Sequence, residues 1–239
     1  MNIFASLKVG TKLIAGFLAV ALVVVVVAVV GYNNMNSINA GMTTLFEDRT
    51  VPIHQLGQVD AVLFKMRGDV YKYLIFPEER AATSAALAEN VNVIDTELDA
   101  YRLTKMVAEE RTALAVLDAT WVNYQASIDD VLALIDSGDT DGALALIIDG
   151  GEASNARKAV GAAIDDLLAI NVRVAEATHI EGEETFANAS LTLIVATAAS
   201  VLLAIGLGIV ITRSITNPLT KVARAASGIA EGDLDQQVD

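Results

Sequence analysis

The sequence predicts an all-α protein in which an antiparallel four-helix bundle is continuous with two transmembrane helices. Two apolar stretches without charged residues lie near the ends of the 239-residue chain, and each is long enough to cross a bilayer. Between them, apolar residues recur every three or four positions, which is typical of helices that bury one face. No segment shows the strict alternation that predicts a β-strand. Together these observations favour a helical membrane protein with a helical domain between its spans.

The first apolar run follows a short N-terminal segment, residues 1–12, and covers residues 13–31. This run, LIAGFLAVALVVVVVAVVG, has 19 residues and as a helix extends about 28 Å, close to the thickness of the hydrocarbon core. A cleaved signal peptide is the alternative, but the apolar part of a signal peptide has about 7–15 residues. We therefore expect a transmembrane helix here.

The first bundle helix follows the span and carries an apolar stripe that keeps one phase on both sides of Pro52. Such a repeat over about five heptads is typical of a bundle seam. Proline lacks the amide hydrogen of a helix interior, so Pro52 should bend or briefly interrupt the helix and Pro77 should end it. The stripe consists of Met35, Ile38, Met42, Leu45, Leu56, Val59, Leu63, Met66, Val70 and Tyr73.

Two further helices are expected at about residues 79–104 and 107–136, because apolar residues again recur at helical spacing. Trp121 and Tyr124 lie on the stripe of the latter helix, which favours a place in the core over a place in a binding site.

The fourth helix should begin near Asp141, with Asp139 or Thr140 as its N-cap, and loosen at Gly150-Gly151. No proline follows until beyond the second apolar run, so this helix can continue into that run.

The second apolar run gives the second span, residues 191–212. The 21 residues from Leu191 to Ile211 reach about 32 Å as a helix. Lys8 and Lys12 precede the first span, and three basic residues follow the second, so the positive-inside rule places both termini in the cytoplasm. The expected location is the plasma membrane, with residues 32–190 outside the cytoplasm.

The charge distribution excludes some classes of partner. The formal net charge is −14, and residues 32–190 contain 11 basic and 26 acidic residues. So much negative charge argues against binding to nucleic acid or to anionic lipid headgroups. The chain has no cysteine, so a disulfide framework is excluded.

The opening SLKVGTKLIAGFLAV, the bundle, the second span and the segment that follows it resemble a methyl-accepting chemotaxis protein with a four-helix-bundle sensor. The segment at residues 213–239 resembles the start of a HAMP domain, the dimeric linker of such receptors. Pro218-Leu219 stands where the first HAMP helix opens, and Gly232-Asp233-Leu234 stands where its connector starts. The residues that we expect to transmit the signal are Arg213, Pro218, Gly232, Asp233 and Leu234.

This resemblance implies a homodimer, a small-molecule ligand and downstream signalling proteins that act through a C-terminal region. The chain ends at Asp239, before the second HAMP helix, so we expect the input half of a receptor without its output half. Sensor kinases and cyclases share such a front end, which leaves the class of output open. A membrane adaptor whose bundle binds another protein is the alternative from a different functional class.

No catalytic constellation is visible in the sequence, and we expect no enzyme, no cofactor and no metal site. His54 and His179 are far apart, without the Glu-x-x-His spacing of a bundle metal site. No nucleophile is paired with a base.

The best candidate for ligand binding is the basic cluster Lys65, Arg67 and Lys72 on the first bundle helix. In so acidic a domain, these residues could receive the carboxylate of an organic or amino acid, with Arg67 offering two parallel hydrogen bonds. The alternative is an ordinary solvated face, on which Lys65 and Lys72 are each spaced to pair with Asp69.

Small residues recur every four positions along the second span, at Ala196, Ser200, Ala204 and Gly208. Lipid tails are as apolar as leucine, so membrane helices associate through close packing over small residues. We therefore expect this stripe to pack against another helix. The alternative is that small residues are simply common in membrane helices.

Overall fold

The computed structural model describes residues 9–230, and the elements in this range are all helical. The described chain falls into two compact units. One unit is Asn39–Gly182, and the other combines residues up to Ile38 with residues from Glu183 onward. The all-α class predicted from the sequence is confirmed.

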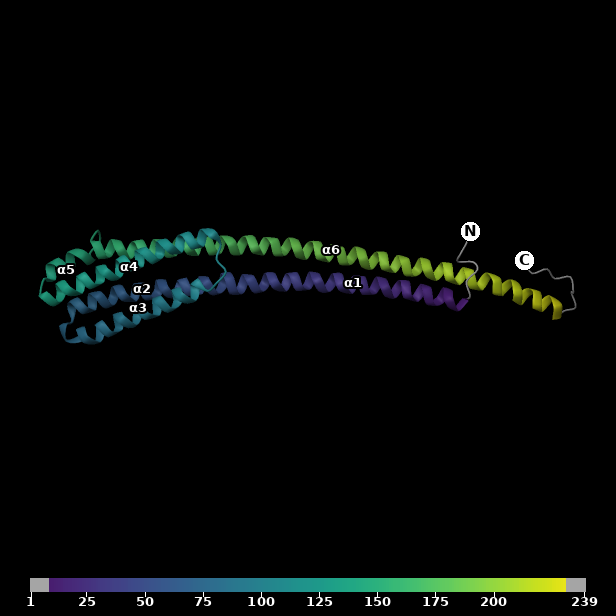
Figure 1. The fold of residues 1–239 in the computed structure, drawn as a ribbon, viewed down its shortest axis with the longest axis horizontal. Helices are drawn as coiled ribbons and strands as arrows, with labels where there is room; N and C mark the ends of the chain where they lie inside the picture. Colours follow the sequence, from purple (N-terminus) through teal and green to yellow (C-terminus); the bar gives the residue numbers. More distant parts are fainter. Residues whose placement is uncertain (1–8, 231–239) are drawn as a thin grey trace. The chain divides into compact units, whose positions relative to one another are not determined.

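The unit Asn39–Gly182 is the four-helix bundle. The elements of the chain are α1 Val9–Leu45, the π-helical turn Phe46–Thr50, α2 Val51–Ile75, the 3₁₀ turn Pro77–Glu79, α3 Arg80–Arg102, α4 Ala108–Ser137, α5 Thr140–Ile147 and α6 Glu152–Ala230. In the bundle, α2 and α3 form one hairpin, and α4 lies beside α5 and the first part of α6 (Figure 1). The hairpin follows from Pro77, which starts the 3₁₀ turn directly after α2 ends.

The connections between helices follow the predicted turn chemistry. The helix runs without a break from Val9 to Ile75, so Pro52 lies inside it, shortly after the π-helical turn Phe46–Thr50. Its missing amide hydrogen removes one helical bond, and the π-helical turn is the brief interruption expected near this proline. Gly138 ends α4 with a φ of 86°, a left-handed conformation that glycine adopts without strain. The carboxylate of Asp139 accepts a hydrogen bond of 2.9 Å from the Gly142 N–H, which confirms this residue as an N-cap.

The expected fourth helix is divided into α5 and α6 rather than only loosened. Gly150 has a φ of 86° and turns the chain between them. Gly151 approaches the carbonyl oxygens of Ala145 and Leu146 so closely that any Cβ would overlap them. The double glycine therefore ends one helix and lets another begin.

The bundle core confirms most of the predicted stripes. From Leu56 to Tyr73, the six predicted stripe residues have exposed fractions of at most 7%. Trp121 and Tyr124 are 4% and 3% exposed, in agreement with a core position. Met35 and Met42 are instead 72% and 67% exposed, so the prediction that they are buried is wrong. Residues 48–49 contact the connection between α3 and α4, which closes this end of the bundle. Met42 lies before these residues in the chain and therefore outside the bundle core.

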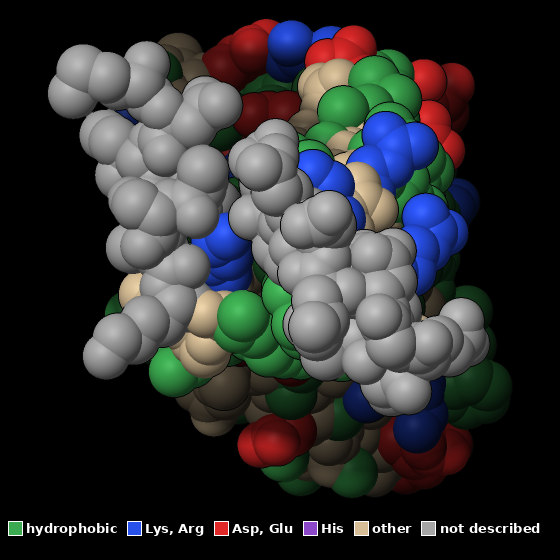
Figure 2. All heavy atoms as spheres, turned by 90° about the vertical axis from the view of Figure 1, so that its right-hand side faces the viewer, with side chains coloured by type: hydrophobic (Ala, Val, Ile, Leu, Met, Phe, Trp, Pro, Cys, Tyr) green, Lys and Arg blue, Asp and Glu red, His purple; other side chains and the backbone are tan. Residues whose placement is uncertain are grey.

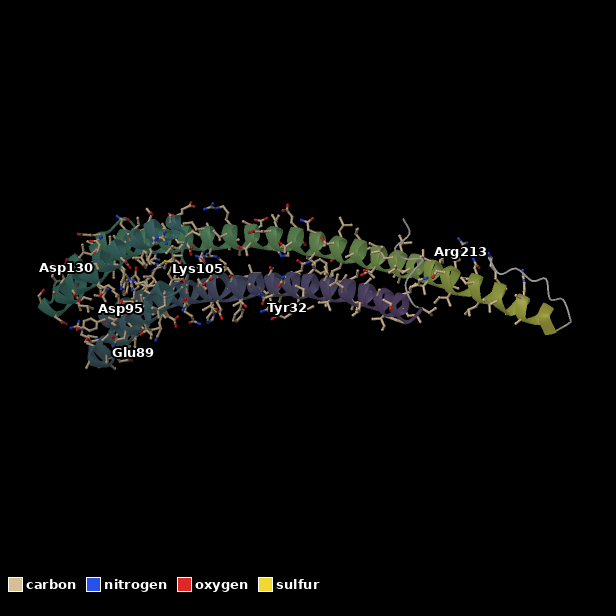
Figure 3. All side chains as sticks on the ribbon, turned by 45° about the vertical axis from the view of Figure 1, so that its right-hand side comes forward. Tyr32, Glu89, Asp95, Lys105, Asp130 and Arg213 are labelled. Atoms are coloured by element: carbon tan, nitrogen blue, oxygen red, sulfur yellow. The ribbon has the colours of Figure 1, made fainter. Side chains whose placement is uncertain are left out.

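The other unit contains α1 up to residue 38 and α6 from residue 183, which lie side by side within it (Figure 3). Both helices contain a window of 18 residues that is long and apolar enough to cross a membrane, with mean hydropathy of 3.3 and 2.6. They approach closely at Gly16, where an added Cβ would lie 2.5 Å from Ile211 Cδ1. The structure thus contains two candidate membrane spans, by length and composition.

Basic residues follow the second candidate span. The end-on view of Figure 2 shows blue Lys and Arg side chains beside the grey residues at the end of the molecule that faces the viewer. The sequence places Arg213, Lys221 and Arg224 in the last part of α6.

Candidate functional site

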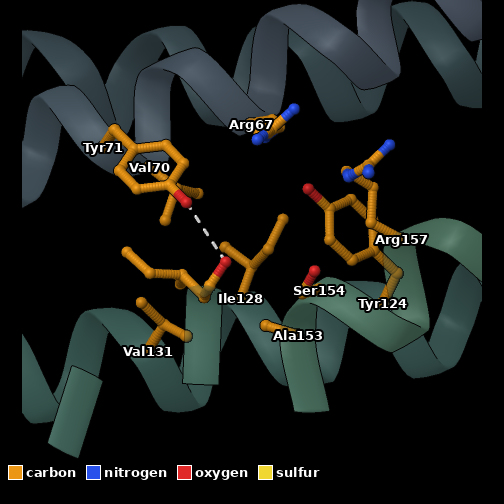
Figure 4. A pocket seen from close by; sticks show the side chains of 10 residues that line it. Arg67, Val70, Tyr71, Tyr124, Ile128, Val131, Ala153, Ser154 and Arg157 are labelled. Atoms are coloured by element: carbon orange, nitrogen blue, oxygen red, sulfur yellow. Dashed lines mark hydrogen bonds between the residues drawn. The ribbon is translucent and has the colours of Figure 1, made fainter. Parts of the chain in front are cut away.

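A small pocket lies between α2, α4 and α6 of the bundle, beside α5. Its volume of about 20 Å³ is room for about one water molecule, so a larger ligand requires the lining side chains to move. The lining residues are Arg67, Val70, Tyr71, Tyr124, Ile128, Val131, Ile147, Ala153, Ser154 and Arg157 (Figure 4).

Two guanidinium groups lie at this pocket, that of Arg67 on α2 and that of Arg157 on α6 (Figure 4). The guanidinium carbon of Arg67 is 5.9 Å from the centroid of the Tyr71 ring, and that of Arg157 is 5.4 Å from the Phe64 ring. Within residues 9–230, neither arginine forms a salt bridge with a carboxylate. Both guanidiniums can therefore offer paired hydrogen bonds to the carboxylate of a ligand.

Nearby groups offset only part of the positive charge of the two arginines. Burial raises the pKa of Tyr124 to about 12, while the charges of Arg157 and Arg67 act in the opposite direction. The Tyr124 hydroxyl is therefore a neutral hydrogen-bond donor. Burial and the charge of Asp165 raise the pKa of Asp60, and the charge of Arg157 lowers it. Negative charge is thus near Arg157 without forming a salt bridge to it.

The start of α6 adds polar groups to the same pocket. The first backbone bond of the α6 ladder runs from Asn155 N to Gly151 O, so the N–H groups of Ala153 and Ser154 precede that ladder. Such N–H groups and the helix dipole favour an anion. Tyr71 Oη donates a hydrogen bond of 3.2 Å to the Ile147 carbonyl, which ties α2 to the end of α5 (Figure 4).

The structure separates the three residues of the predicted basic cluster. Arg67 lies at the pocket, whereas Lys65 Nζ donates a hydrogen bond of 2.9 Å to Asn90 Oδ1 on α3. Lys72 Nζ is 2.6 Å from Glu79 Oε2, and this hydrogen bond raises the pKa of Lys72. The alternative pairing with Asp69 is also replaced, since the Asp69 carboxylate accepts a hydrogen bond from Asn90.

Sequence reasoning missed Arg157, although a signal was present. Arg157 and Lys158 are the only basic residues between Glu152 and Asn171, on a helix whose first two turns otherwise carry acidic, neutral polar and apolar residues. Lys158 forms a salt bridge with Asp149, whereas Arg157 is the basic residue of α6 that lines the pocket.

Of the residues expected to transmit the signal, Arg213 and Pro218 lie in α6 and are exposed. Gly232, Asp233 and Leu234 lie outside the described residues. Within the small-residue stripe, Ala196, Ser200 and Ala204 are half-buried, and Gly208 is exposed.

We predict that the stripe is a packing face. Single cysteines at positions 196, 200 and 204 should crosslink readily to cysteines in the first span or in a second copy, because small residues permit close approach. Cysteines at Ala198, Leu202 and Ile209, which are exposed, should not. The natural chain has no cysteine, so oxidative crosslinking in membranes has no background. Equal crosslinking from both faces would contradict the prediction.

Comparison with known proteins agrees with this architecture. Residues 6–186 match the family model described as a four helix bundle sensory module for signal transduction. A protein of Acetivibrio thermocellus described as a sensory transducer is 26% identical over 174 residues, which cover 72% of this chain and 31% of that protein. The chain thus spans about a third of the length of this relative. No solved structure matches the chain. The family match covers more than half of the chain, which therefore belongs to the four-helix-bundle sensory modules of signal transduction.

Proposed function

We propose that this chain is the input module of a two-pass membrane receptor of the chemoreceptor type. Residues 32–190 bind a small organic or amino acid outside the cytoplasm, and α6 carries the signal through residues 191–212. The segment at residues 213–239 acts as the start of a HAMP domain in a homodimer, and a further region contacts the downstream signalling proteins. The family match and the two candidate spans support a membrane sensor.

The single observation that carries the ligand class is the pair of guanidinium groups at one pocket. The bundle has an excess of acidic residues, yet Arg67 and Arg157 lie at the pocket without a salt bridge in the described part of the chain. A carboxylate that binds both would link α2 to α6. A ligand at this place therefore contacts the helix that continues toward the second span.

Thermal unfolding of the whole chain in detergent or nanodiscs, with a panel of small mono- and dicarboxylates, tests the proposal. A ligand at about 100 times its Kd should stabilise the folded state by about 2.7 kcal/mol. If no carboxylate shifts the midpoint but a partner protein does, the chain is an adaptor and the ligand proposal is wrong.

Topology is tested separately. If both termini are cytoplasmic, protease added to intact cells or spheroplasts should cut within residues 32–190 and spare Lys221, because the bilayer protects the inner face. Epitope tags at the two termini, detected with antibodies, identify the fragments. Protection of the bundle, with cleavage near Arg224, would invert the topology.

A further inference from the structure

Four buried polar side chains meet in one hydrogen-bonded cluster within the apolar bundle. The exposed fractions of Arg49, Tyr101, Glu110 and Asn171 are 4%, 0%, 0% and 0%. They come from four segments: the π-helical turn, the end of α3, the start of α4, and α6. Each occupies a position in an otherwise apolar seam, and enclosing a charge costs free energy unless it is well paired.

An ion pair forms the centre of this cluster. Arg49 Nη1 lies 2.8 Å from Glu110 Oε2, and Arg49 Nη2 donates a hydrogen bond of 3.0 Å to the Lys105 carbonyl. Glu110 Oε2 also accepts a hydrogen bond of 2.7 Å from the Val107 N–H, and Oε1 accepts one of 3.0 Å from the Tyr101 hydroxyl. The pair is thus fixed to the connection between α3 and α4.

Asn171 joins α6 to this centre. Its Nδ2 donates hydrogen bonds of 2.8 Å to the Tyr101 hydroxyl oxygen and 3.0 Å to the Leu167 carbonyl. Its Oδ1 accepts a longer bond of 3.4 Å from Arg49 Nη1. Burial raises the pKa of Tyr101, so its hydroxyl stays protonated and can donate to Glu110 while it accepts from Asn171.

The cluster forms the last buried layer of the bundle. Within the unit Asn39–Gly182, no residue before Arg49 and none after Asn171 is buried. Arg49 also lies in the π-helical turn, an irregularity that is frequent at functional sites.

Not every buried hydrogen-bond donor of the cluster has a partner within the described residues. Arg49 Nε is buried and has no hydrogen-bond partner within the described residues, and the bond from Arg49 to Asn171 is long. An unpaired buried donor carries a desolvation cost. This arrangement is therefore less stable than a fully paired one would be.

We propose that these four residues are a register lock, which holds α6 at one axial position against the end of α3 and the π-helical turn. Apolar contacts have no preferred direction, whereas hydrogen bonds do. An axial shift of about 2 Å would stretch the 2.8 Å bond between Asn171 and Tyr101 to about 3.4 Å and misalign it. Release of Asn171 then frees α6 to move. The inference rests on the proposed function insofar as movement of α6 is the signal.

The test measures helix register in the whole chain in lipid, without ligand. A cysteine at Gly31 is paired in turn with cysteines at Ala189, Leu193 and Thr197, which are one helical turn apart. In the structure a Cβ at Gly31 would lie 3.5 Å from Leu193 Cδ2, so the pair 31–193 should crosslink fastest. Asn171→Leu should lower the rate of this pair relative to its neighbours about fivefold or more.

The control is Thr83→Val, which replaces another buried polar side chain, 2% exposed, that has no hydrogen-bond partner in the described chain. It should leave the relative rates unchanged. If Asn171→Leu does not fold, Tyr101→Phe removes the hydroxyl that accepts from Asn171, keeps the ring in the layer and gives the same comparison. Unchanged relative rates in a folded lock variant would overturn the lock, while ligand binding and topology would remain open to their own tests.

Discussion

Replacing Glu110 by alanine is expected to lower the free energy of unfolding of the bundle by about 3–5 kcal/mol, because it leaves a buried cation unpaired. Glu110 is fully buried, and its carboxylate receives hydrogen bonds from Arg49, Tyr101 and the Val107 N–H. Without it, the Arg49 guanidinium would keep the Lys105 carbonyl and the distant Asn171 oxygen as partners. Chemical denaturation of the whole chain in detergent, followed by circular dichroism, measures the change.

The adjacent residue supplies a matched control. Glu109 also pairs with an arginine, at 2.5 Å from Arg173 Nη2, but the side chains of this pair are 59% and 60% exposed. Water screens such a pair, so Glu109→Ala should change stability by at most about 1 kcal/mol. Replacing Arg49 and Glu110 together by leucine should cost far less than Glu110→Ala, because no charge is then left buried. Equal losses for Glu109→Ala and Glu110→Ala would show that the buried pair is not special.

The bundle was predictable because its physical cause is local. Apolar residues at helical spacing mark the buried faces, and proline and glycine mark the turns, so the helix ends fall within a few residues of those expected. The π-helical turn was not predictable, since its partners come from α4, from the connection between α3 and α4, and from α6. Pro52 indicated an interruption, and Arg49 is a charged residue in an apolar stripe, but neither specifies a π-helical turn. The break between α5 and α6 was underestimated, because two glycines indicate flexibility but not the close backbone contact at Gly151.

The pocket was predictable only in part. The charge contrast identified Arg67, but successive residues of a helix are rotated by about 100°. Lys65 and Lys72 therefore lie on nearly the same side of α2, and Arg67 lies on the other. This rotation about the helix axis explains why the two lysines bond to Asn90 and Glu79 rather than lie at the pocket. Arg157 is 90 positions further along the chain, so only the packing of α6 against α2 brings it to the pocket.

The two arginines should act together on the affinity for a carboxylate. Arg67→Ala and Arg157→Ala are each expected to weaken binding by about 1.5–3 kcal/mol, the range for a hydrogen bond to a charged group. That loss corresponds to a Kd about 10–150 times higher. Calorimetric titration of the whole chain measures it, with the first carboxylate that raises the unfolding midpoint as the probe.

Two further variants make this result specific. Arg173→Ala removes the same charge from α6 away from the pocket, where Arg173 pairs with Glu109, and should leave the Kd nearly unchanged. In the double variant, both arginines are absent. If one carboxylate bridges them, the two single losses should not add, and a coupling of about 0.5–3 kcal/mol should remain. If Arg173→Ala weakened binding equally, long-range charge alone would explain the effect of the two arginines. If Arg67→Ala left the affinity unchanged, the ligand would not bind at this pocket.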